Sequence, residues 1–132
     1  MNLIKQKDLI KGNFEEIRIK CIINEYFNCN VLKTEDNHPM DFIASNMYFE
    51  IKSRNNNYNK YPTTMIGKNK INFANNNPDK IYYFIFSFYD GDYYYKYNKS
   101  DKLDFGIGGR NDRGKNEYKQ YCYIPISYLT KL

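Results

Sequence analysis

The middle of the chain alternates between apolar and polar residues with the period of two that is typical of half-buried β-strands. Residues 40–44 and 47–53 both show this alternation, and the turn-forming pair Ser45-Asn46 separates them. We therefore predict two antiparallel strands joined by a two-residue turn. The register that this turn sets pairs Ala44 with Met47, Phe42 with Phe49 and Asp41 with Glu50.

The two faces of the predicted hairpin differ in chemistry. Phe49 and Ile51 point toward a core, whereas Glu50 and Lys52 share the opposite face. Directly opposed side chains lie about 4.5–5.5 Å apart between their Cβ atoms, so the carboxylates of Asp41 and Glu50 repel each other unless a cation neutralises them. Such hard oxygen ligands suit Mg²⁺ or Mn²⁺, and a neighbouring lysine can orient or help to deprotonate a metal-bound water.

The N-terminal part of the chain is predicted to be a helix from Lys7 to Phe27, with Gly12 at its true start or at a break. Its apolar residues return at helical spacing and form one stripe, made of Ile19, Ile22, Ile23, Tyr26 and Phe27. Glu15 and Glu16 fall near the edges of this stripe, one turn before it. An acid there either leans over the hairpin or is simply a first-turn acid that the helix dipole favours.

The segments around the hairpin have weaker patterns. We expect a short strand over residues 30–33 and polar loops over residues 34–39 and 55–61. A second helix is predicted from Pro62 to about Ala74, because proline is favoured in the first turn of a helix. Thr63 or Thr64 is its expected N-cap.

The last third of the chain begins with a strong β signal. Residues 80–89, KIYYFIFSFY, form a nearly continuous run of aromatic and β-branched side chains, which predicts a strand buried on both faces. Asp90-Gly91 is a strong hairpin turn, and a further strand is predicted over residues 92–97.

A glycine-rich basic segment follows within residues 104–119 and is predicted to be a loop. It lacks the third glycine of a dinucleotide-binding motif and the lysine-serine or lysine-threonine pair of a P-loop. Residues 120–126 then predict a last strand, which Pro125 places at a sheet edge.

Length and charge limit the protein class. With 132 residues, the chain is predicted to be a single domain, residues 1–132. It has 20 Lys and Arg against 15 Asp and Glu, and this net charge of +5 is compatible with a polyanionic partner. The charged N-terminus is unlike a signal peptide, and no apolar run approaches the roughly 18 residues of a membrane span. These features predict a soluble intracellular protein.

The three cysteines and the one histidine do not form a zinc-binding pattern. Cys21, Cys29 and Cys122 have no C-x-x-C spacing, so we expect free thiols in a reducing compartment. A lone loop histidine such as His38 is more typical of a solvated residue than of a ligand.

Two motifs in this sequence resemble nuclease motifs. Pro39, Asp41, eight intervening residues and then Glu50-Ile51-Lys52 resemble the signature of the PD-(D/E)XK nuclease superfamily. Residues 11–16, KGNFEE, resemble the first helix of archaeal Holliday-junction resolvases and related phage nucleases, in which a glycine is followed four residues later by a metal-site glutamate. That spacing matches Glu16, with Glu15 as the second choice.

This resemblance implies an α/β fold with a restriction-endonuclease-like core, in which a mixed sheet of about five strands is flanked by helices. It also implies a metal-dependent DNA endonuclease that acts as a homodimer. The resemblance assigns Mg²⁺, or Mn²⁺, to four ligands: Asp41, Glu50, the carbonyl of Ile51, and Glu16. Lys52 would position the attacking water. The small size and a composition typical of AT-rich genomes favour a viral or phage protein, which would act in the cytoplasm or nucleus of a host.

Basic residues near these motifs are candidate DNA contacts. They are Arg54 on the Glu50 face, Lys68 and Lys70 on the second predicted helix, and Arg110, Arg113 and Lys115 in the glycine-rich segment. Each of these positions also fits a solvated surface residue. The sequence does not separate a Holliday-junction resolvase from a site-specific restriction or homing endonuclease.

Three other classes of function stay open. The first is a noncatalytic nucleic-acid-binding module that keeps the nuclease fold. The second is a β-rich protein that binds RNA or single strands through its 15 tyrosines, although most of these lie in predicted strands and suit sheet packing. The third is an inhibitory or structural role in a virus.

Overall fold

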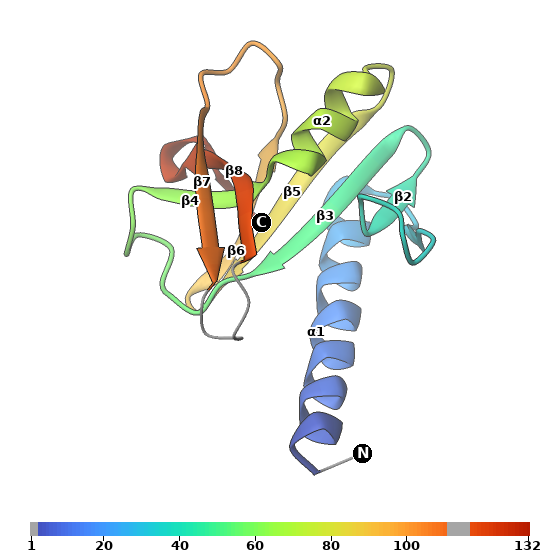
Figure 1. Ribbon diagram of the computed structural model, residues 1–132. Coiled ribbons are helices and arrows are strands. Elements are labelled where there is room, and N and C mark those ends of the chain that lie inside the picture. Colours follow the sequence, from blue (N-terminus) through green and yellow to red (C-terminus); the bar gives the residue numbers. More distant parts are fainter. Residues whose placement is uncertain (1–2, 111–116) are drawn as a thin grey trace. The chain divides into compact units, whose positions relative to one another are not determined.

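The computed structural model describes residues 3–110 and 117–132 (Figure 1). It divides into two compact units, Met1–Leu32 and Lys33–Leu132. The first unit contains helix α1, Leu3–Phe27, which begins before the predicted Lys7 and runs through Gly12. Gly12 is therefore neither the start of the helix nor a break, since one glycine inside a helix costs only about 1 kcal/mol.

The chain forms a mixed six-stranded sheet. Its strands, in the order in which they lie side by side, are β1 (Leu32–Lys33), β2 (Phe42–Ala44), β3 (Met47–Ser53), β5 (Ile81–Phe88), β6 (Gly91–Lys96) and β9 (Thr130–Lys131). β3 and β5 lie side by side and are parallel, whereas β2 and β3 are antiparallel (Figure 1). β5 with β6 and β6 with β9 are antiparallel as well. The predicted α/β class with a mixed sheet is confirmed and is consistent with a restriction-endonuclease-like core.

Three further strands form a second, antiparallel sheet in the order β4 (Thr63–Gly67), β8 (Glu117–Pro125) and β7 (Asp104–Arg110). β4 corrects the prediction of a helix from Pro62, because the helix α2 spans only Lys68–Asn76. Thr64 and Ile66 are buried while Met65 between them is exposed, which is the alternation of a strand. Pairing with β8 and the β-branched side chains outweigh the local N-cap signal.

The glycine-rich segment that we predicted as a loop is in part a strand, β7, which pairs with β8 from Asp104 to Arg110. A Cβ atom at Gly106 would lie 2.9 Å from the ring of Tyr123, and one at Gly108 would lie 3.0 Å from the ring of Tyr121. The two glycines therefore leave room for aromatic rings that lie across the strand.

The last predicted strand is also placed differently. β8 is the central strand of the three-stranded sheet, so its predicted edge position is wrong. Pro125 is tolerated there because it is the last residue of the strand, where it pairs with Thr63. A short 3₁₀-helix, Ile126–Tyr128, follows it.

Aromatic side chains of β5 form the main core of the second unit. Every residue from Tyr82 to Phe88 is buried, which confirms the strand predicted over residues 80–89. The core cluster joins β5 to α2 and to the three-stranded sheet: Tyr82, Phe84, Phe86 and Phe88 with Ile66, Ile71, Ala74, Cys122 and Ile124. Since burial of each large apolar side chain contributes about 1.5–3 kcal/mol, β5 gives the neighbouring β3 a rigid support.

The cysteines are free thiols, as predicted. Cys122 is fully buried, and this burial is the main cause that raises its pKa to about 11, so the thiol stays protonated. No helix in the described part of the chain is long and apolar enough to cross a membrane.

Candidate active site

The predicted hairpin is present, and its register is confirmed from Phe42 to Ala44: Phe42 with Phe49, Ile43 with Tyr48 and Ala44 with Met47. Ser45 has a φ of 55°, in the left-handed region that tight two-residue hairpin turns use. The ladder begins at Phe42, so Asp41 lies directly before β2, and its N–H donates to the carbonyl of Phe49 at 3.0 Å. Asp41 therefore reaches β3 from the start of the neighbouring strand.

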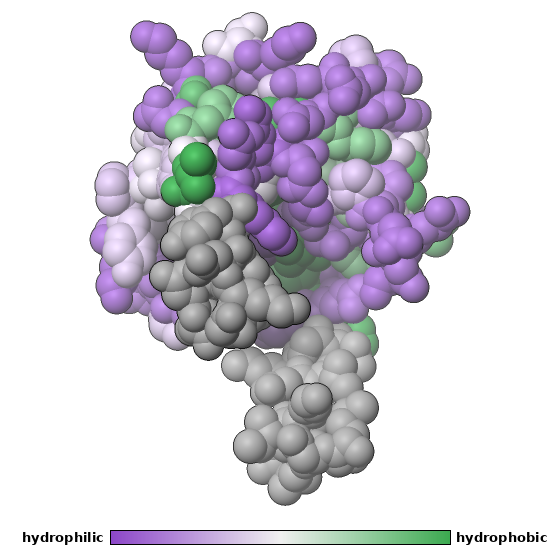
Figure 2. Space-filling model, in the orientation of Figure 1, coloured by the Kyte–Doolittle hydropathy of each residue, from purple (hydrophilic) through white to green (hydrophobic). Residues whose placement is uncertain are grey.

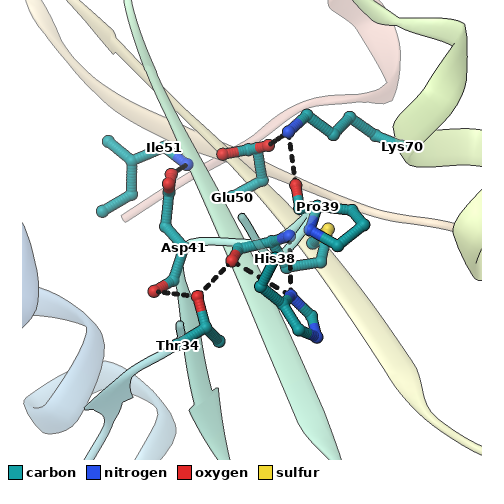
Figure 3. Close-up of polar contacts among 8 residues, drawn as sticks. Thr34, His38, Pro39, Asp41, Glu50, Ile51 and Lys70 are labelled. Atoms are coloured by element: carbon teal, nitrogen blue, oxygen red, sulfur yellow. Dashed lines mark hydrogen bonds and ion pairs between the residues drawn. The ribbon is translucent and has the colours of Figure 1, made fainter. Parts of the chain in front are cut away.

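Backbone groups fix the orientation of Asp41 (Figure 3). Its carboxylate Oδ2 accepts a hydrogen bond of 2.8 Å from the N–H of Ile51. Its carbonyl accepts from both the N–H and the hydroxyl of Thr34, at 3.0 and 2.9 Å. The carboxylate is thus held against β3 beside Glu50.

Glu50 lies on β3, and only 2 % of it is exposed. This burial is the largest cause that raises its pKa from 4.5 to about 8, followed by the hydrogen bond and the negative charge of Asp41, while Lys70 acts in the opposite direction. Without a bound cation, Glu50 therefore holds a proton more readily than an ordinary glutamate does. Two facing acids of this kind form a site that gains stability from added positive charge.

Lys70 of α2 supplies one such charge. Its Nζ lies 2.7 Å from Glu50 Oε2 and also donates to the carbonyl of Pro39 (Figure 3). The contact with Glu50 is close enough for an ion pair, but its angles are not those of a hydrogen bond. Glu50 Oε2 is accordingly a buried oxygen without a hydrogen-bond partner among the residues that the structure describes. A buried acceptor in this state is a strong candidate to bind a cation.

The oxygen donors at this place suit a hard divalent cation. Asp41 and Glu50 offer carboxylates, and Ile51 offers the next carbonyl along β3. Within the described residues, no group of three or more acidic, cysteine or histidine side chains gathers to hold a metal. Two carboxylates and a carbonyl are hard oxygen donors of the kind that Mg²⁺ or Mn²⁺ binds together with several waters.

Glu16, the fourth predicted ligand, is a half-buried residue of α1 in the first unit. Its role as a ligand stays a prediction. Glu15, the second choice, pairs with Arg18 of the same helix at 3.0 Å between Oε2 and Nη2. This is an ordinary exposed pair at i,i+3 spacing, which contributes only a few tenths of a kcal/mol, about 0.2–0.5.

A basic cleft of about 550 Å³ lies next to the carboxylates. Its lining residues come from β3, β4, α2 and β8: Lys52, Arg54, Met65, Ile66, Gly67, Asn69, Lys70, Lys119 and Tyr121. Figure 2 shows this face hollowed, with hydrophilic side chains around the hollow. Lys52 follows Glu50 by two residues on the same strand face, as predicted, and it lines the cleft. The cleft combines cationic side chains with few acids and suits a phosphate backbone.

Arg54 lines the cleft and also forms hydrogen bonds to β4. Its Nε donates to the Thr64 hydroxyl at 3.2 Å, its Nη2 donates to the carbonyl of Met65, and its guanidinium lies 5.7 Å from the centre of the Phe86 ring. Burial lowers its pKa, although an arginine stays charged. Arg54 therefore links the two sheets, and its predicted contact with phosphate stays a prediction.

The other predicted DNA contacts divide into three groups. Lys70 lines the cleft, whereas the ammonium of Lys68 lies over the ring of Phe105 at 5.6 Å and is not part of the lining. Arg110 ends β7, and nothing is described of its side chain. Arg113 and Lys115 lie outside the described residues.

Sequence reasoning missed Lys119, Asn69 and Tyr121, which line the cleft. Lys119 and Tyr121 lie on the same face of β8, two residues apart. The alternation of Lys119-Gln120-Tyr121-Cys122 was the available signal, but it falls across the boundary that we predicted between loop and strand. Only the pairing of β8 with β4 in the structure reveals that Lys119 and Tyr121 line the cleft.

His38 is not a solvated loop residue. Its Nδ1 accepts a hydrogen bond of 3.0 Å from the N–H of buried Met40, and its ring stacks on Tyr48 with 5.1 Å between ring centres. The ring also meets Phe73 of α2 edge-on, at 5.1 Å. His38 and Thr34 thereby hold the segment that carries Asp41 from both sides (Figure 3).

Replacing Thr34 by valine is expected to lower the free energy of unfolding by about 0.5–1.5 kcal/mol, because the carbonyl of Asp41 loses its hydroxyl donor. Thr34→Ser, which keeps the hydroxyl, is the matched control and should stay close to the unaltered protein. Urea unfolding followed by circular dichroism measures both. A loss in Thr34→Ser without a loss in Thr34→Val would show that the methyl group, not the hydroxyl, matters at this position.

Comparison with known proteins identifies a family that this chain matches. Residues 11–132 match the family described as "Phage putative PDDEXK endonuclease". No curated protein and no solved structure gives a significant match. The matched range includes the hairpin, the acid pair and every described residue of the basic cleft.

Proposed function

Since the chain belongs to this phage PDDEXK endonuclease family, within the PD-(D/E)XK nuclease superfamily, we propose that it is a metal-dependent endonuclease that hydrolyses phosphodiester bonds in DNA. One observation carries the proposal more than any other. It is the buried Asp41–Glu50 pair beside a basic cleft, with an acceptor oxygen on Glu50 that has no hydrogen-bond partner in the described part of the chain. A nuclease needs both parts, a cation-binding acid pair and a surface for phosphates.

Asp41, Glu50 and the carbonyl of Ile51 would hold Mg²⁺ or Mn²⁺, and Glu16 is the proposed fourth ligand. When bound, the cation supplies charge stabilisation at the phosphate and makes a water more acidic. The protein itself contributes pre-organised geometry, because Asp41 is fixed by the N–H of Ile51 and Glu50 by its burial in β3. The ligands therefore need little rearrangement to bind.

The cationic side chains of the cleft would act on the DNA. Lys70 and Lys119 neutralise phosphates and fix the register of the backbone. Lys52, closer to the acid pair along β3, would orient the attacking water and assist its deprotonation. Among the described residues, no hydrogen bond or ion pair engages the ammonium of Lys52, so it is available for this task.

Lys52→Ala should lower the rate of DNA cleavage by about 10²-fold or more while the affinity for Mn²⁺ changes only a few-fold, because proton transfer is lost and the ligands remain. Single-turnover cleavage and calorimetric metal titration measure the two effects. Lys119→Ala is the control from the same cleft, and we expect it to weaken DNA binding without changing the rate at saturation. Parallel losses of rate and metal affinity in Lys52→Ala would contradict this role.

A cleavage assay tests the proposed function. Supercoiled plasmid, linear duplex and a four-way junction are incubated with Mg²⁺, Mn²⁺ or EDTA, with the unaltered protein beside Asp41→Ala. Cutting that requires the metal and is lost in the variant is the expected result. The preferred substrate then separates a resolvase-like enzyme from a restriction or homing type. No cutting, with DNA still bound in EDTA, would instead support a noncatalytic nucleic-acid-binding module.

We extend the proposal to the whole protein. Residues 1–132 would form one nuclease domain, and two copies would form a homodimer, since cutting both strands of a duplex requires two sites. A phage nuclease would act inside the infected host cell.

The noncatalytic alternative is favoured by one observation, namely that Lys70 already provides Glu50 with a positive charge.

A further inference from the structure

A second cavity, of about 200 Å³, lies beside the basic cleft and shares Arg54 and Met65 with it. Its lining combines aromatic rings with small polar side chains: Arg54, Asn56, Tyr58, Tyr61, Thr63, Thr64, Met65, Phe88, Tyr123 and Ile126. Neither the hairpin nor the proposed chemistry uses this cavity. Its place next to the cleft means that a ligand whose charged part lies in the cleft can extend a flat part into the cavity.

The inner wall of the cavity is rigid. Tyr58 stacks on Tyr93 with 4.1 Å between ring centres, and its hydroxyl donates to the carbonyl of Ile126 at 3.0 Å. Its ring also meets Phe88 edge-on, at 5.9 Å. Tyr61, by contrast, is 53 % exposed at the rim. A fixed aromatic wall together with an exposed tyrosine at the rim suits a planar ring that stacks on aromatic side chains.

Three hydroxyl groups of the cavity are available to recognise such a ring. In the described parts of the chain, no hydrogen bond engages the hydroxyls of Tyr61, Thr63 and Tyr123, whereas the Thr64 hydroxyl accepts from Arg54. Aside from Arg54, whose guanidinium is bonded to β4, the lining is uncharged. The cavity therefore has no place for a second phosphate, and its hydroxyls suit the donor and acceptor edge of a base.

We propose that this cavity binds one unpaired nucleobase of the DNA whose phosphates lie in the basic cleft. The inference rests on the proposed function and gives it a substrate class: DNA with unpaired nucleotides, such as a flap or an extrahelical base. The volume is below the 300–1,000 Å³ of typical small-molecule pockets, which fits a single flat ring and excludes a whole nucleotide. Stacking on aromatic side chains adds affinity at a base that is already unpaired, since no pairing has to be broken.

Fluorescence anisotropy in EDTA tests this inference with two labelled probes, a perfect duplex and the same duplex with one extra unpaired nucleotide. The unaltered protein should bind the second probe about tenfold more tightly. Tyr61→Ala should lose most of this preference, whereas Tyr61→Phe, which keeps the ring, should retain most of it. Tyr89→Ala is the matched control, because Tyr89 is 72 % exposed and lines neither cavity.

The outcomes separate this inference from the proposed function. Equal affinity for the two probes, or a preference that survives Tyr61→Ala, would overturn the nucleobase site and leave the nuclease proposal intact. Loss of affinity for both probes alike in Tyr61→Ala would assign Tyr61 to general DNA binding and also overturn it. No binding of either probe, together with no metal-dependent cleavage, would overturn the proposed function itself.

Discussion

Replacing Asp41 by asparagine should lower the rate of DNA cleavage by at least about 10²–10³-fold and leave DNA binding unchanged or tighter. Asparagine keeps an oxygen that can accept from the N–H of Ile51, so the local backbone should stay in place. The substitution removes one of the two negative charges that would hold the metal. It also removes a negative charge close to bound phosphates, which is why DNA binding is not expected to weaken.

Single-turnover cleavage in Mg²⁺ and anisotropy in EDTA measure the two effects of Asp41→Asn separately. Asp36→Asn is the matched control, since Asp36 is an exposed acid of the same segment. It should change neither cleavage nor binding. Cleavage that persists in Asp41→Asn would remove Asp41 from the metal site, and loss of binding along with cleavage would point to a structural role of its charge.

The hairpin and the buried strand β5 were predictable because their signals are local. The alternation of residues 47–53 and the two-residue turn at Ser45 fix the register without reference to any distant segment. The run Tyr82–Phe88 needs only to be apolar on both faces to become a central strand. The acid pair followed from this register, and so did the position of Lys52 beside it.

The second sheet was not predictable because its pairing is nonlocal. β4 contains threonines that also suit a helix N-cap, and only β8, some 60 residues later in the chain, makes the segment a strand. The glycines of β7 read as loop residues, yet they make room for Tyr121 and Tyr123. The basic cleft depends on this sheet, and the sequence therefore identified Lys70 but not Lys119.

Lys70 and Glu50, for which the sequence predicted two separate roles, form an ion pair. Lys70 was predicted as a DNA contact and Glu50 as a metal ligand, and their side chains meet at 2.7 Å. Coulombic attraction over such a distance is strong in a low-dielectric site. A bound cation would take over the neutralisation of Glu50, so Lys70 would then be available to the phosphates of the cleft that it lines.

Glu50→Gln should remove a pH dependence of stability that the unaltered protein shows without metal. The pKa of Glu50 is about 8 in the folded protein and about 4.5 when unfolded, so between these values the folded state holds a proton that the unfolded state has lost. The contribution of protonated Glu50 to the stability of the fold is therefore fully present below pH 4.5, falls as the pH rises, and is lost above pH 8. The difference of about 3.5 between the two pKa values corresponds to a change in the free energy of unfolding on the order of 3–5 kcal/mol across this pH range.

Thermal unfolding in EDTA between pH 5 and pH 9 measures this effect. The unaltered protein should lose stability toward pH 9, whereas Glu50→Gln should keep a nearly constant melting temperature and become the more stable of the two at pH 9. Glu35→Gln, at an exposed position of the same unit, should follow the unaltered protein. Parallel curves for Glu50→Gln and the unaltered protein would mean that Glu50 is ionised throughout this range.

Added Mn²⁺ is expected to compete with the proton on Glu50. A cation must displace the proton from this carboxyl, so metal affinity should rise by up to about tenfold per pH unit below pH 8. Mn²⁺ should therefore raise the melting temperature of the unaltered protein most at pH 8 and above, where the charged pair destabilises the metal-free fold. Glu50→Gln should gain little from the metal at any pH. Glu50 would then both lower the stability of the metal-free protein and bind the metal. The lower stability without metal would be a consequence of keeping a buried carboxylate that can accept a cation.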